Sequence, residues 1–463
     1  MARDIAEMTE GPGREIVEAA HATEEVTRRQ LVRAVIASTV GTSIEWYDFF
    51  LYGSAAALVF GKQFFPTFDP LTGVLLAFGT YFVGFAARPV GAAIFGHYGD
   101  RIGRKATLIT TLLLMGVATF LVGLVPPYEA IGPWAGLILT LLRALQGIGV
   151  GGEWGGSVLL SMEWGAKTGK RGFIASWPQF GVPVGLLLSN GILAATTALT
   201  GPSFETWGWR IPFLLSLLLI AVGLYIRLGI LETPIFARLL EERRTAAAPV
   251  AEVLRSHWKE VVLCALLRTG QQAPFYIFVT FVLTYATKRL EFSNQTVLNY
   301  VLLASAVSLF TVPLWGYVSD MVGRKRMYAI GAVAMALFAF PYFILLDTRD
   351  PLLVLLAILL APVVHDMQYG PQAAFIGESF PPRLRYSGSS LGYHLASITS
   401  GGPAPLIALW LLDWFNSSAS IAVYMVITAL ISLASAALLR DRGKADITVE
   451  YEEPTVPVRP AVA

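Results

Sequence analysis

The chain has 463 residues, of which 55% are hydrophobic and 14% are charged, and its formal net charge at pH 7 is +2. This composition leaves too little polar surface for a water-soluble domain, and the near-neutral charge gives no reason to expect a nucleic-acid partner. The single cysteine, Cys264, excludes a disulfide within the chain. The lipid bilayer is therefore the first partner that we expect.

Apolar runs of about 20 residues, the length that crosses the hydrocarbon layer as a helix, occur about twelve times. They lie at residues 33–58, 72–95, 106–126, 134–158, 173–198, 209–229, 259–286, 297–318, 327–346, 351–375, 388–412 and 419–440. Open sheets would leave backbone groups unpaired in lipid, and these runs lack the short alternating pattern of barrel strands. We therefore predict an all-α membrane protein with twelve transmembrane helices.

The segments outside these runs divide the chain into five parts. Residues 1–30 mix acidic and basic side chains without an apolar core, so they predict a disordered tail and not a cleavable signal. Residues 231–257 are charged and polar and predict a linker. Residues 441–463, rich in proline near their end, predict a flexible tail. Between these parts lie two bundles of six helices, residues 31–230 and 258–440.

Basic residues predict the orientation of the chain, since Lys and Arg of short loops stay cytoplasmic. With the amino terminus inside, the inner loops contain fifteen basic residues, among them Arg101, Lys170 and Arg326, whereas the outer loops contain Lys62, Lys288, Arg289 and Arg349. We therefore expect both termini in the cytoplasm of a bacterial cell and the chain in its inner membrane.

A charged motif occurs twice, at an interval of 220 residues. The segment Gly96-His-Tyr-Gly-Asp100-Arg-Ile-Gly103-Arg104-Lys105 returns as Gly316-Tyr-Val-Ser-Asp320-Met-Val-Gly323-Arg324-Lys325, each copy between two apolar runs. Two homologous membrane bundles fused in tandem are typical of transporters. In each copy the Asp precedes an Arg by four positions, which suits an ion pair.

Two charge clusters follow from this motif and from the ends of the fourth and tenth runs. We expect a cluster of Asp100, Arg104 and Glu163 and a matching cluster of Asp320, Arg324 and Glu378. Their predicted role is gating of the inner side, because closure would bring each cluster against the opposite bundle. The alternative is a solvated loop that only fixes topology.

Ionisable residues inside the predicted helices mark a functional region, because a charge at the bilayer centre costs about 2.5–3.5 kcal/mol and needs a partner or water. Seven of the eight lie in helices 1, 4, 7 and 10, the first and fourth of each bundle, as a central cavity would require. The eight are Glu45, Asp48, Arg88, Arg143, Glu153, Arg268, His365 and Asp366. For each one the alternative is a structural ion pair, which we favour for Arg88.

Residues three or four apart share a helix face, so the charges can be grouped with polar neighbours. The carboxylates predicted to couple protons are Asp48, Glu45, Glu153 and Asp366. The side chains predicted to bind substrate are Arg143, Gln146, Arg268, Gln272, Tyr276, Tyr369 and Gln372.

Four further segments, together with the repeated motif, resemble the metabolite:proton symporter family of the major facilitator superfamily, and the likeness spans nearly the whole chain. They are Ile44-Glu45-Trp46-Tyr47-Asp48-Phe49, Ala87-Arg88-Pro89-Val90-Gly91, Gly151-Gly152-Glu153-Trp154-Gly155-Gly156 and Leu231-Glu232-Thr233-Pro234-Ile235-Phe236. Arg143-Ala-Leu-Gln146-Gly147 resembles the superfamily's motif in helix 4. The resemblance implies alternating access and proton-coupled uptake of small organic acids or zwitterions such as proline and betaine.

Two departures from the family pattern limit this inference. The second motif copy has Met321 where the first has Arg101, which predicts a weaker gate on that side. The short tail lacks the coiled-coil extension of some osmosensing relatives, which disfavours a role in compatible-solute uptake.

The mechanistic hypothesis begins with Arg143, which at mid-depth needs a counter-charge and has candidates in Glu45 and Asp48. Protonation of that carboxylate would free Arg143 to bind a substrate carboxylate through two hydrogen bonds, while Arg268 holds the substrate from the other bundle. We expect a symporter of organic acid anions that acts as a monomer.

The same pocket would also suit a sensor that binds a metabolite without moving it, a role for which we find no linked signalling domain. No enzyme chemistry is expected, since the sequence offers no metal-ligand cluster, cofactor motif or nucleophile with an adjacent base. A channel fits duplicated gates less well than alternating access does.

Overall fold

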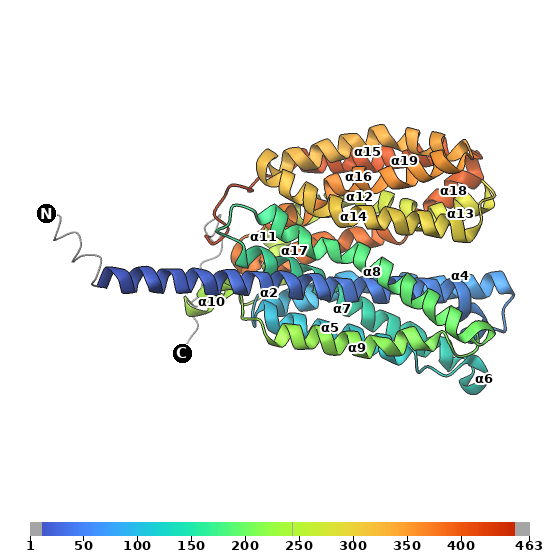
Figure 1. Ribbon diagram of the computed structural model, residues 1–463, viewed down its shortest axis with the longest axis horizontal. Coiled ribbons are helices and arrows are strands. Elements are labelled where there is room, and N and C mark those ends of the chain that lie inside the picture. The colour runs from blue at the N-terminus through green and yellow to red at the C-terminus, as the bar shows by residue number, and fades with distance from the viewer. Residues whose placement is uncertain (1–11, 243, 450–463) are drawn as a thin grey trace.

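The computed structural model describes residues 12–242 and 244–449, and these form two helical bundles that pack side by side (Figure 1). The first bundle consists of α2 (Pro12–Ala55), α4 (Pro70–Gly99), α5 (Arg104–Val122), α7 (Trp134–Trp164), α8 (Arg171–Thr200) and α9 (Arg210–Leu228). The second consists of α12 (Trp258–Tyr276) with α13 (Val282–Lys288), α14 (Asn294–Val322), α15 (Arg324–Asp347), α16 (Pro351–Gly377), α17 (Arg385–Ala396) with α18 (Ala404–Phe415), and α19 (Ala419–Leu438). The predicted all-α architecture of twelve helices in two bundles is confirmed.

Three membrane helices contain a π-helical turn, where the hydrogen-bond ladder widens by one residue. These turns are η1 (Ala56–Phe60), which joins α2 to α3 (Gly61–Phe64), η3 (Ile277–Phe281) between α12 and α13, and η5 (Ser397–Gly401) between α17 and α18. Pro274 lies just before η3 and lacks the backbone N–H that a regular helix needs there. The remaining short elements are α6 (Tyr128–Ile131), α10 (Pro234–Glu241), α11 (Pro249–Ser256), η2 (Gly201–Phe204) and η4 (Pro382–Leu384).

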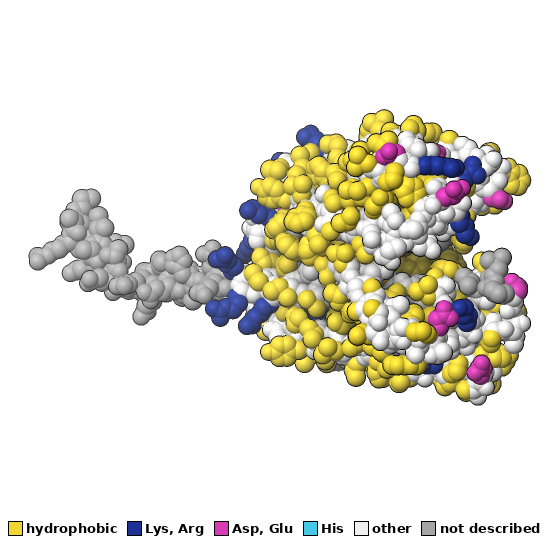
Figure 2. All heavy atoms as spheres, turned by 45° about the vertical axis from the view of Figure 1, so that its right-hand side comes forward, with side chains coloured by type: hydrophobic (Ala, Val, Ile, Leu, Met, Phe, Trp, Pro, Cys, Tyr) yellow, Lys and Arg dark blue, Asp and Glu magenta, His cyan; other side chains and the backbone are white. Residues whose placement is uncertain are grey.

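Ten helices of the described chain are long and apolar enough to cross a membrane. The two remaining members of the set of twelve are α2 and the run from α12 to α13, which carry several of the charges found in the sequence. Large apolar side chains such as Leu218, Phe310 and Leu337 are exposed on the outside of the bundles, where lipid is their natural solvent. Figure 2 shows hydrophobic side chains over much of the outside of the bundles.

The two bundles meet along α8 and α14 and along α4, α7 and α17. Glycines bring the backbones together at both seams. A Cβ on Gly155 would overlap Ser390, a Cβ on Gly96 would overlap the backbone of Ser387, and Gly172 and Gly316 face each other's carbonyl oxygens. In the glycine-rich segment around Glu153, Gly155 therefore serves the close approach of α7 to α17, whereas Gly151 and Gly152 face α4.

The molecule has two different ends. We call the end that carries Asp100, Asp320, α10 and α11 the motif side, and there many contacts join the bundles. The other end, the opposite side, comes forward in Figure 2 and is hollowed between the bundles, with hydrophobic side chains in the recess. The structure therefore represents a state that is closed on the motif side.

The segments outside the membrane helices are more ordered than the sequence predicted. Helix α2 begins at Pro12, so residues 12–30 continue the first membrane helix. The predicted linker contains α10 and α11, and residues 441–449 pack on the motif side, where the Ile447 side chain is fully buried. The rest of both predicted tails, residues 1–11 and 450–463, lies outside the described residues.

Candidate functional site

Two connected pockets lie between the bundles. The central pocket is lined by Trp46 and Val182 of the first bundle and by Arg268, Gln271, Gln272, Phe275, Tyr276, Tyr369 and Tyr393 of the second. The side pocket shares Val182, Phe275 and Tyr369 with it and extends between α8, α14 and α16, where the His365 and Asp366 side chains form its polar part. Counted together with the part that is open to solvent, the space in the side pocket is about 530 Å³ and the space in the central pocket is about 220 Å³.

Arg268 is the cation of the central pocket. Its guanidinium lies 3.3 Å from the centre of the Tyr393 ring, and Nη1 donates to the Tyr393 carbonyl oxygen at 2.8 Å. Its Nε is buried and has no hydrogen-bond partner among the described residues. Because a buried guanidinium N–H without an acceptor is costly, Arg268 is a ready donor to an anionic ligand.

The floor of the central pocket, on the motif side, is a stack across the bundle interface. The Trp154 and Tyr393 rings stack at 3.6 Å with an angle of 11° between their planes. Trp154 is held by Gln179, which accepts from its Nε1 at 2.8 Å. This stack separates the pocket from the contacts of the motif side.

An aromatic layer lies next to the same pocket. Trp46 meets Phe275 at 5.8 Å and Phe85 meets Tyr276 at 5.5 Å between ring centres, so both contacts cross the interface. The Arg88 guanidinium lies over Phe49 and Phe85 at 4.8 and 4.9 Å from their centres. Arg88, for which the sequence favoured a structural ion pair, is therefore packed among the rings that border the pocket.

Glu45 and Asp48 lie on different faces of α2. Glu45 is within electrostatic range of Arg88 and Arg268, and its buried Oε2 has no hydrogen-bond partner among the described residues. Asp48 instead points toward α5, where its Oδ2 accepts from the Thr119 hydroxyl at 2.8 Å. Glu45 is thus the carboxylate nearer to the central pocket's arginine.

The predicted pairing of Arg143 with a carboxylate does not occur in this structure. No ion pair joins Arg143 to Glu45 or Asp48 within the described chain, and the guanidinium lies over Tyr52 and Tyr81 at 4.4 and 4.9 Å from their ring centres. Arg143 donates to Gln146 at 3.1 Å and Gln146 donates to Thr119 at 2.5 Å. Two side chains therefore relay the contact between Arg143 and Asp48.

Glu153 faces away from both pockets, into the first bundle. Its Oε1 pairs with Arg227 of α9 and accepts from Ser157 at 2.9 Å, and its Oε2 accepts from Thr111 at 2.9 Å. A buried carboxylate with three partners is satisfied within its own bundle. Arg227, which was not among the predicted residues, lies inside the predicted run 209–229.

Asp366 belongs to a chain of polar contacts in the second bundle. Its Oδ1 is 2.7 Å from Nδ1 of His365, and its Oδ2 accepts from Thr311. Nε2 of His365 is 2.6 Å from Nε2 of Gln271, which lines the central pocket. His365 and Gln271 are not among the predicted site residues, although His365 lies on the face of α16 that carries Tyr369.

The remaining predicted substrate residues divide into two groups. Tyr276, Tyr369 and Gln272 line the central pocket, where Gln272 contacts Ser397 and Ser400 at 3.4 and 3.3 Å. Gln372 points toward α15 and donates to Tyr328 at 3.0 Å. The linings of the two pockets include neither Gln372 nor Gln146.

The structure brings together the first predicted charge cluster on the motif side. Arg104 lies 3.2 Å from Asp100 and 3.3 Å from Glu163. The Asp100 carboxylate accepts from the backbone N–H groups of Tyr386 and Ser387 at 3.1 and 2.9 Å. Asp100 therefore binds the first turn of α17, which belongs to the other bundle.

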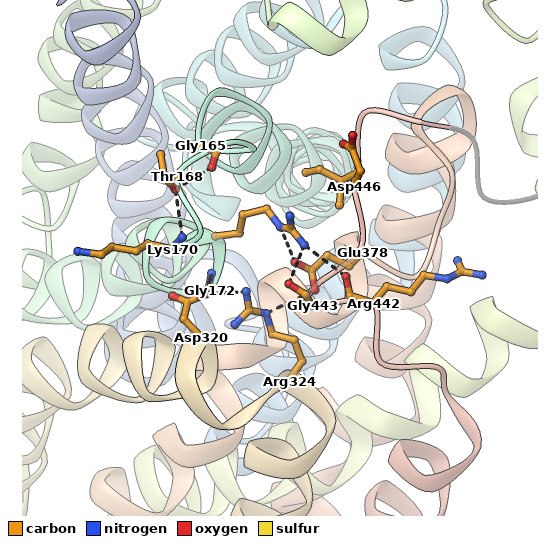
Figure 3. A network of polar contacts seen from close by, with 12 residues as sticks. Gly165, Thr168, Lys170, Gly172, Asp320, Arg324, Glu378, Arg442, Gly443 and Asp446 are labelled. Atoms are coloured by element: carbon orange, nitrogen blue, oxygen red, sulfur yellow. Dashed lines mark hydrogen bonds and ion pairs between the residues drawn. The ribbon is translucent and has the colours of Figure 1, made fainter. Parts of the chain in front are cut away.

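The second cluster repeats this arrangement in the reverse direction (Figure 3). Arg324 lies 2.6 Å from Asp320 and 3.4 Å from Glu378. The Asp320 carboxylate accepts from the backbone N–H groups of Gly172 and Phe173, both at 2.9 Å, in the first turn of α8. Each bundle thus contributes an aspartate to a helix of its partner.

The linker motif also contributes to the first cluster. Glu232 accepts from the Lys105 backbone N–H at 3.1 Å, Thr233 donates to Glu163 at 2.5 Å, and the Phe236 ring lies 4.8 Å from the Arg104 guanidinium. The glycines of the repeated motif have positive φ, 116° at Gly103 and 101° at Gly323, which side chains with a Cβ rarely adopt. The contacts of Glu232, Thr233 and Phe236 explain the linker motif, and the positive φ angles explain the glycines of the repeated motif; the sequence alone explained neither.

The carboxy-terminal segment Asp441–Thr448 joins both bundles on the motif side. Arg171 of α8 donates to the carbonyl oxygen of Gly443 at 2.9 Å and to Glu378 at 2.9 Å (Figure 3). Arg385 of α17 donates to the carbonyl oxygen of Ile447 at 2.9 Å. This segment is therefore part of the closed motif side.

Comparison with known families places the chain among membrane transporters. Residues 39–404 match the family model described as Major Facilitator Superfamily. The chain therefore belongs to the Major Facilitator Superfamily, as its motifs predict, and it is a transporter and not an enzyme.

Its relatives include several metabolite carriers. The chain is 41% identical over 420 residues to the shikimate transporter of Escherichia coli (strain K12), a match that covers 89% of this chain and 95% of the relative. It is 32% identical to the glycine betaine/proline/ectoine/pipecolic acid transporter OusA of Dickeya dadantii (strain 3937), which covers 89% of this chain and 84% of the relative. The fold is similar to that of the proton:xylose symporter XylE bound to 6-bromo-6-deoxy-D-glucose, with a TM-score of 0.70, 19% identity, and coverage of 90% of this chain and 97% of XylE.

Proposed function

We propose that this chain is a proton-coupled symporter that imports a small organic acid anion by alternating access. The observation that carries the proposal is Arg268, a buried arginine with an unpartnered N–H in a pocket between two bundles. The pocket is closed on the motif side, and the opposite side of the molecule is hollowed. The similarity to a shikimate transporter also favours a carboxylate that bears hydroxyl groups.

In this proposal Arg268 binds the substrate carboxylate, and hydroxyl groups of the substrate bond to tyrosine and amide side chains. Tyr276 is suited to this role because its buried hydroxyl group has no hydrogen-bond partner among the described residues. Arg143 does not bind the substrate directly in this proposal. It lies outside the pocket among aromatic rings and is connected to Asp48 through Gln146 and Thr119.

Glu45 and Asp48 are the proposed proton carriers. A substrate anion at Arg268 competes with the negative charge of Glu45 for the same cation, so a proton on Glu45 favours anion binding. Substrate and proton would then bind cooperatively, and only the doubly loaded carrier would close. In this scheme Glu153, saturated by Arg227 and two hydroxyl groups, has a structural role.

The motif-side clusters are the proposed gate. Asp100 and Asp320 hold helices of the opposite bundle, so opening on that side breaks four bonds to backbone N–H groups. We assign the motif side to the cytoplasm of a bacterial cell, place the chain in the inner membrane with both termini inside, and regard the monomer as the working unit.

A zwitterionic compatible solute is the second candidate substrate. Trp46, Phe275 and Tyr276 line the pocket, and aromatic rings bind quaternary ammonium groups through cation–π contacts. The similarity to a betaine and proline carrier points the same way.

A thermal-stability panel on purified protein separates these candidates, since a ligand that binds the folded state raises the unfolding temperature. We expect shikimate and related hydroxylated carboxylates to stabilise the protein and betaine and proline to have no effect. Arg268→Ala should weaken binding by about 10- to 100-fold, the value of a hydrogen bond to a charged group. The matched control is Arg326→Ala, which removes an exposed arginine. If betaine stabilises the protein and shikimate does not, the zwitterionic solute becomes the favoured substrate and the organic acid anion is rejected.

Proteoliposomes with an imposed pH gradient test the coupling. Glu45→Gln and Asp48→Asn should lose uphill shikimate uptake but keep exchange of labelled for unlabelled shikimate, which needs no net proton movement. If both variants accumulate shikimate like the parent, proton coupling through α2 is wrong.

A further inference from the structure

The contact chain that begins at Asp366 connects the side pocket to the central pocket. It runs from Thr311 and Asp366 through the His365 ring to the amide of Gln271. All four residues are buried or nearly so, and Gln271 belongs to the lining of the central pocket. This series of contacts therefore ends at the central pocket, where the ligand is expected to bind.

The chemistry of the side chains determines which atom donates and which accepts in each of these hydrogen bonds. An ionised Asp366 only accepts, so Nδ1 of His365 carries a proton and donates across 2.7 Å. In a neutral imidazole the other nitrogen, Nε2, is then an acceptor. Nε2 of Gln271, 2.6 Å away, donates to it.

This arrangement leaves the other end of the amide available. Oε1 of Gln271 is buried and has no hydrogen-bond partner among the described residues. With His365 neutral, the unpaired end of the amide of this pocket-lining residue is therefore an acceptor oxygen, which is unfavourable for a carboxylate.

Protonation of His365 reverses these roles. The imidazolium carries hydrogens on both nitrogens, so Nε2 becomes a donor and can no longer accept from Gln271. The amide must rotate by about 180° for its oxygen to accept from His365. Its NH₂ group then provides donors to the pocket, where an anion can accept them, while Asp366 balances the new charge.

We propose that Gln271 and His365 form a proton-operated amide switch, in which a proton on His365 converts the central pocket from acceptor to donor character and so favours an anionic substrate. The inference rests on the proposed proton-coupled uptake and adds a second proton site, in the bundle opposite Glu45. Gln271 is a binding residue in this scheme and His365 acts through it as a positioning residue.

Other groups surround the switch and act on it through space. Arg268 lies in the lining of the central pocket, and the Asp366 carboxylate contacts the His365 ring directly. The residues of α8 and α14 in the described pocket linings are uncharged. The titratable groups on the neighbouring elements are Arg268 and Tyr276 of α12, Tyr393 and His394 of α17, Tyr342 of α15, Glu45 of α2 and Tyr369 of α16 itself.

The pH dependence of shikimate binding tests the switch. For one linked proton the Kd changes by up to about tenfold per pH unit. We expect the parent to bind shikimate more tightly as the pH falls from 8.5 to 5.5. In Gln271→Met and His365→Gln the slope of log Kd against pH should be smaller by the amount that one linked proton contributes. Gln368→Met, a buried glutamine on α16 outside both pockets, controls for folding and should keep the full slope.

A ligand-free measurement tests the same switch separately from transport. In protein labelled with ¹⁵N-histidine, the signals of His365 are those missing from His365→Gln. We expect an N–H on Nδ1 and an acceptor Nε2 at high pH, with N–H groups on both nitrogens at low pH, and a shifted Nε2 signal in Gln271→Met.

The outcomes separate the two proposals. Full pH slopes in both variants, or a His365 that stays neutral down to pH 5.5, overturn the switch even if proton-driven shikimate uptake is found. Absence of both binding and uptake in the parent overturns the proposed function, and the histidine spectra then decide on the switch.

Discussion

Buried arginines in this protein are compensated in two ways. Arg104, Arg227 and Arg324 each meet a carboxylate. Arg88, Arg143 and Arg268 instead lie over aromatic rings, whose faces attract a cation less strongly than a carboxylate does. Arg268 lines the central pocket and Arg88 packs among the rings that border it, so these two are the cations nearest to the proposed substrate path.

A stability prediction follows for Arg227. Arg227→Met leaves the buried Glu153 without its counter-ion, and breaking such a pair costs about 3–5 kcal/mol. The double variant Arg227→Met with Glu153→Gln removes both charges and keeps the contacts of residue 153 with Thr111 and Ser157. Thermal unfolding in detergent should therefore show a large loss for the single variant and a partial recovery for the double variant. Equal unfolding temperatures would show that the ion pair does not stabilise the fold.

Sequence reasoning succeeded for contacts set by local geometry and failed for those set by helix rotation. The pairs of Asp100 with Arg104 and Asp320 with Arg324 follow from a spacing of four residues. The neighbours of Arg143 depend on how α2, α4 and α7 are rotated against one another, which periodicity does not determine. For the same reason His365 and Gln271 were not chosen, because their contact joins two helices far apart in sequence.

At the scale of elements, the repeated motif acts as a helix cap supplied from outside. The first backbone N–H groups of a helix have no partner within it, and a carboxylate there gains from both hydrogen bonding and the helix dipole. Asp100 provides this for α17 and Asp320 for α8. The gating role of the motif, a prediction from sequence, thus acquires a specific physical basis.

Loss of either cap should open the motif side. A capping side chain contributes about 1 kcal/mol, so Asp100→Ala and Asp320→Ala should each raise the open population about fivefold. The reporter is Ser390→Cys in a Cys264→Ala background, because Ser390 lies buried against Gly155 of the other bundle. Maleimide should label it faster in both variants. Ser432→Cys, buried between α12 and α19 of one bundle, is the control. Unchanged labelling at position 390 would contradict the cap model.

At the scale of the whole molecule, the two bundles are alike in their motifs and in the way the following segment attaches to each motif. Lys105 meets Glu232 of the linker, and Lys325 meets Asp441 in the same way, each through a backbone N–H at 3.1 Å. Beyond Asp441 the chain continues across the interface to Arg171 and Arg385. In the first half the linker beyond Glu232 likewise packs on η4 and α17 of the other bundle, where Glu252 pairs with Arg383. The motif side is therefore held by two similar clusters and by the two segments that follow the bundles.

The buried Ile447 tests the importance of the carboxy-terminal segment. Ile447→Asp places a charge in an apolar cluster with Val253 and Phe380, so the segment should detach and maleimide labelling of Ser390→Cys should rise several-fold. The matched control is Val449→Asp, since Val449 is exposed. Equal labelling in the two variants would mean that the segment does not contribute to closure.

The overall architecture was predictable because lipid imposes strong rules on sequence. Apolar length and the spacing of the repeated motif were enough to predict twelve helices in two bundles. The π-helical turns, the order of residues 12–30 and the docking of residues 441–449 were not predicted, because they depend on neighbours brought in by the fold.

The glycine seams have a consequence for the speed of transport. Where Gly155 of α7 meets Ser390 of α17 and Gly172 of α8 meets Gly316 of α14, main chain lies against a small side chain or against main chain. Surfaces of this kind can part and rejoin without repacking, so friction against the rocking of the halves should be low. Bulky residues at Gly155 or Gly316 would therefore slow the movement of the two bundles against each other.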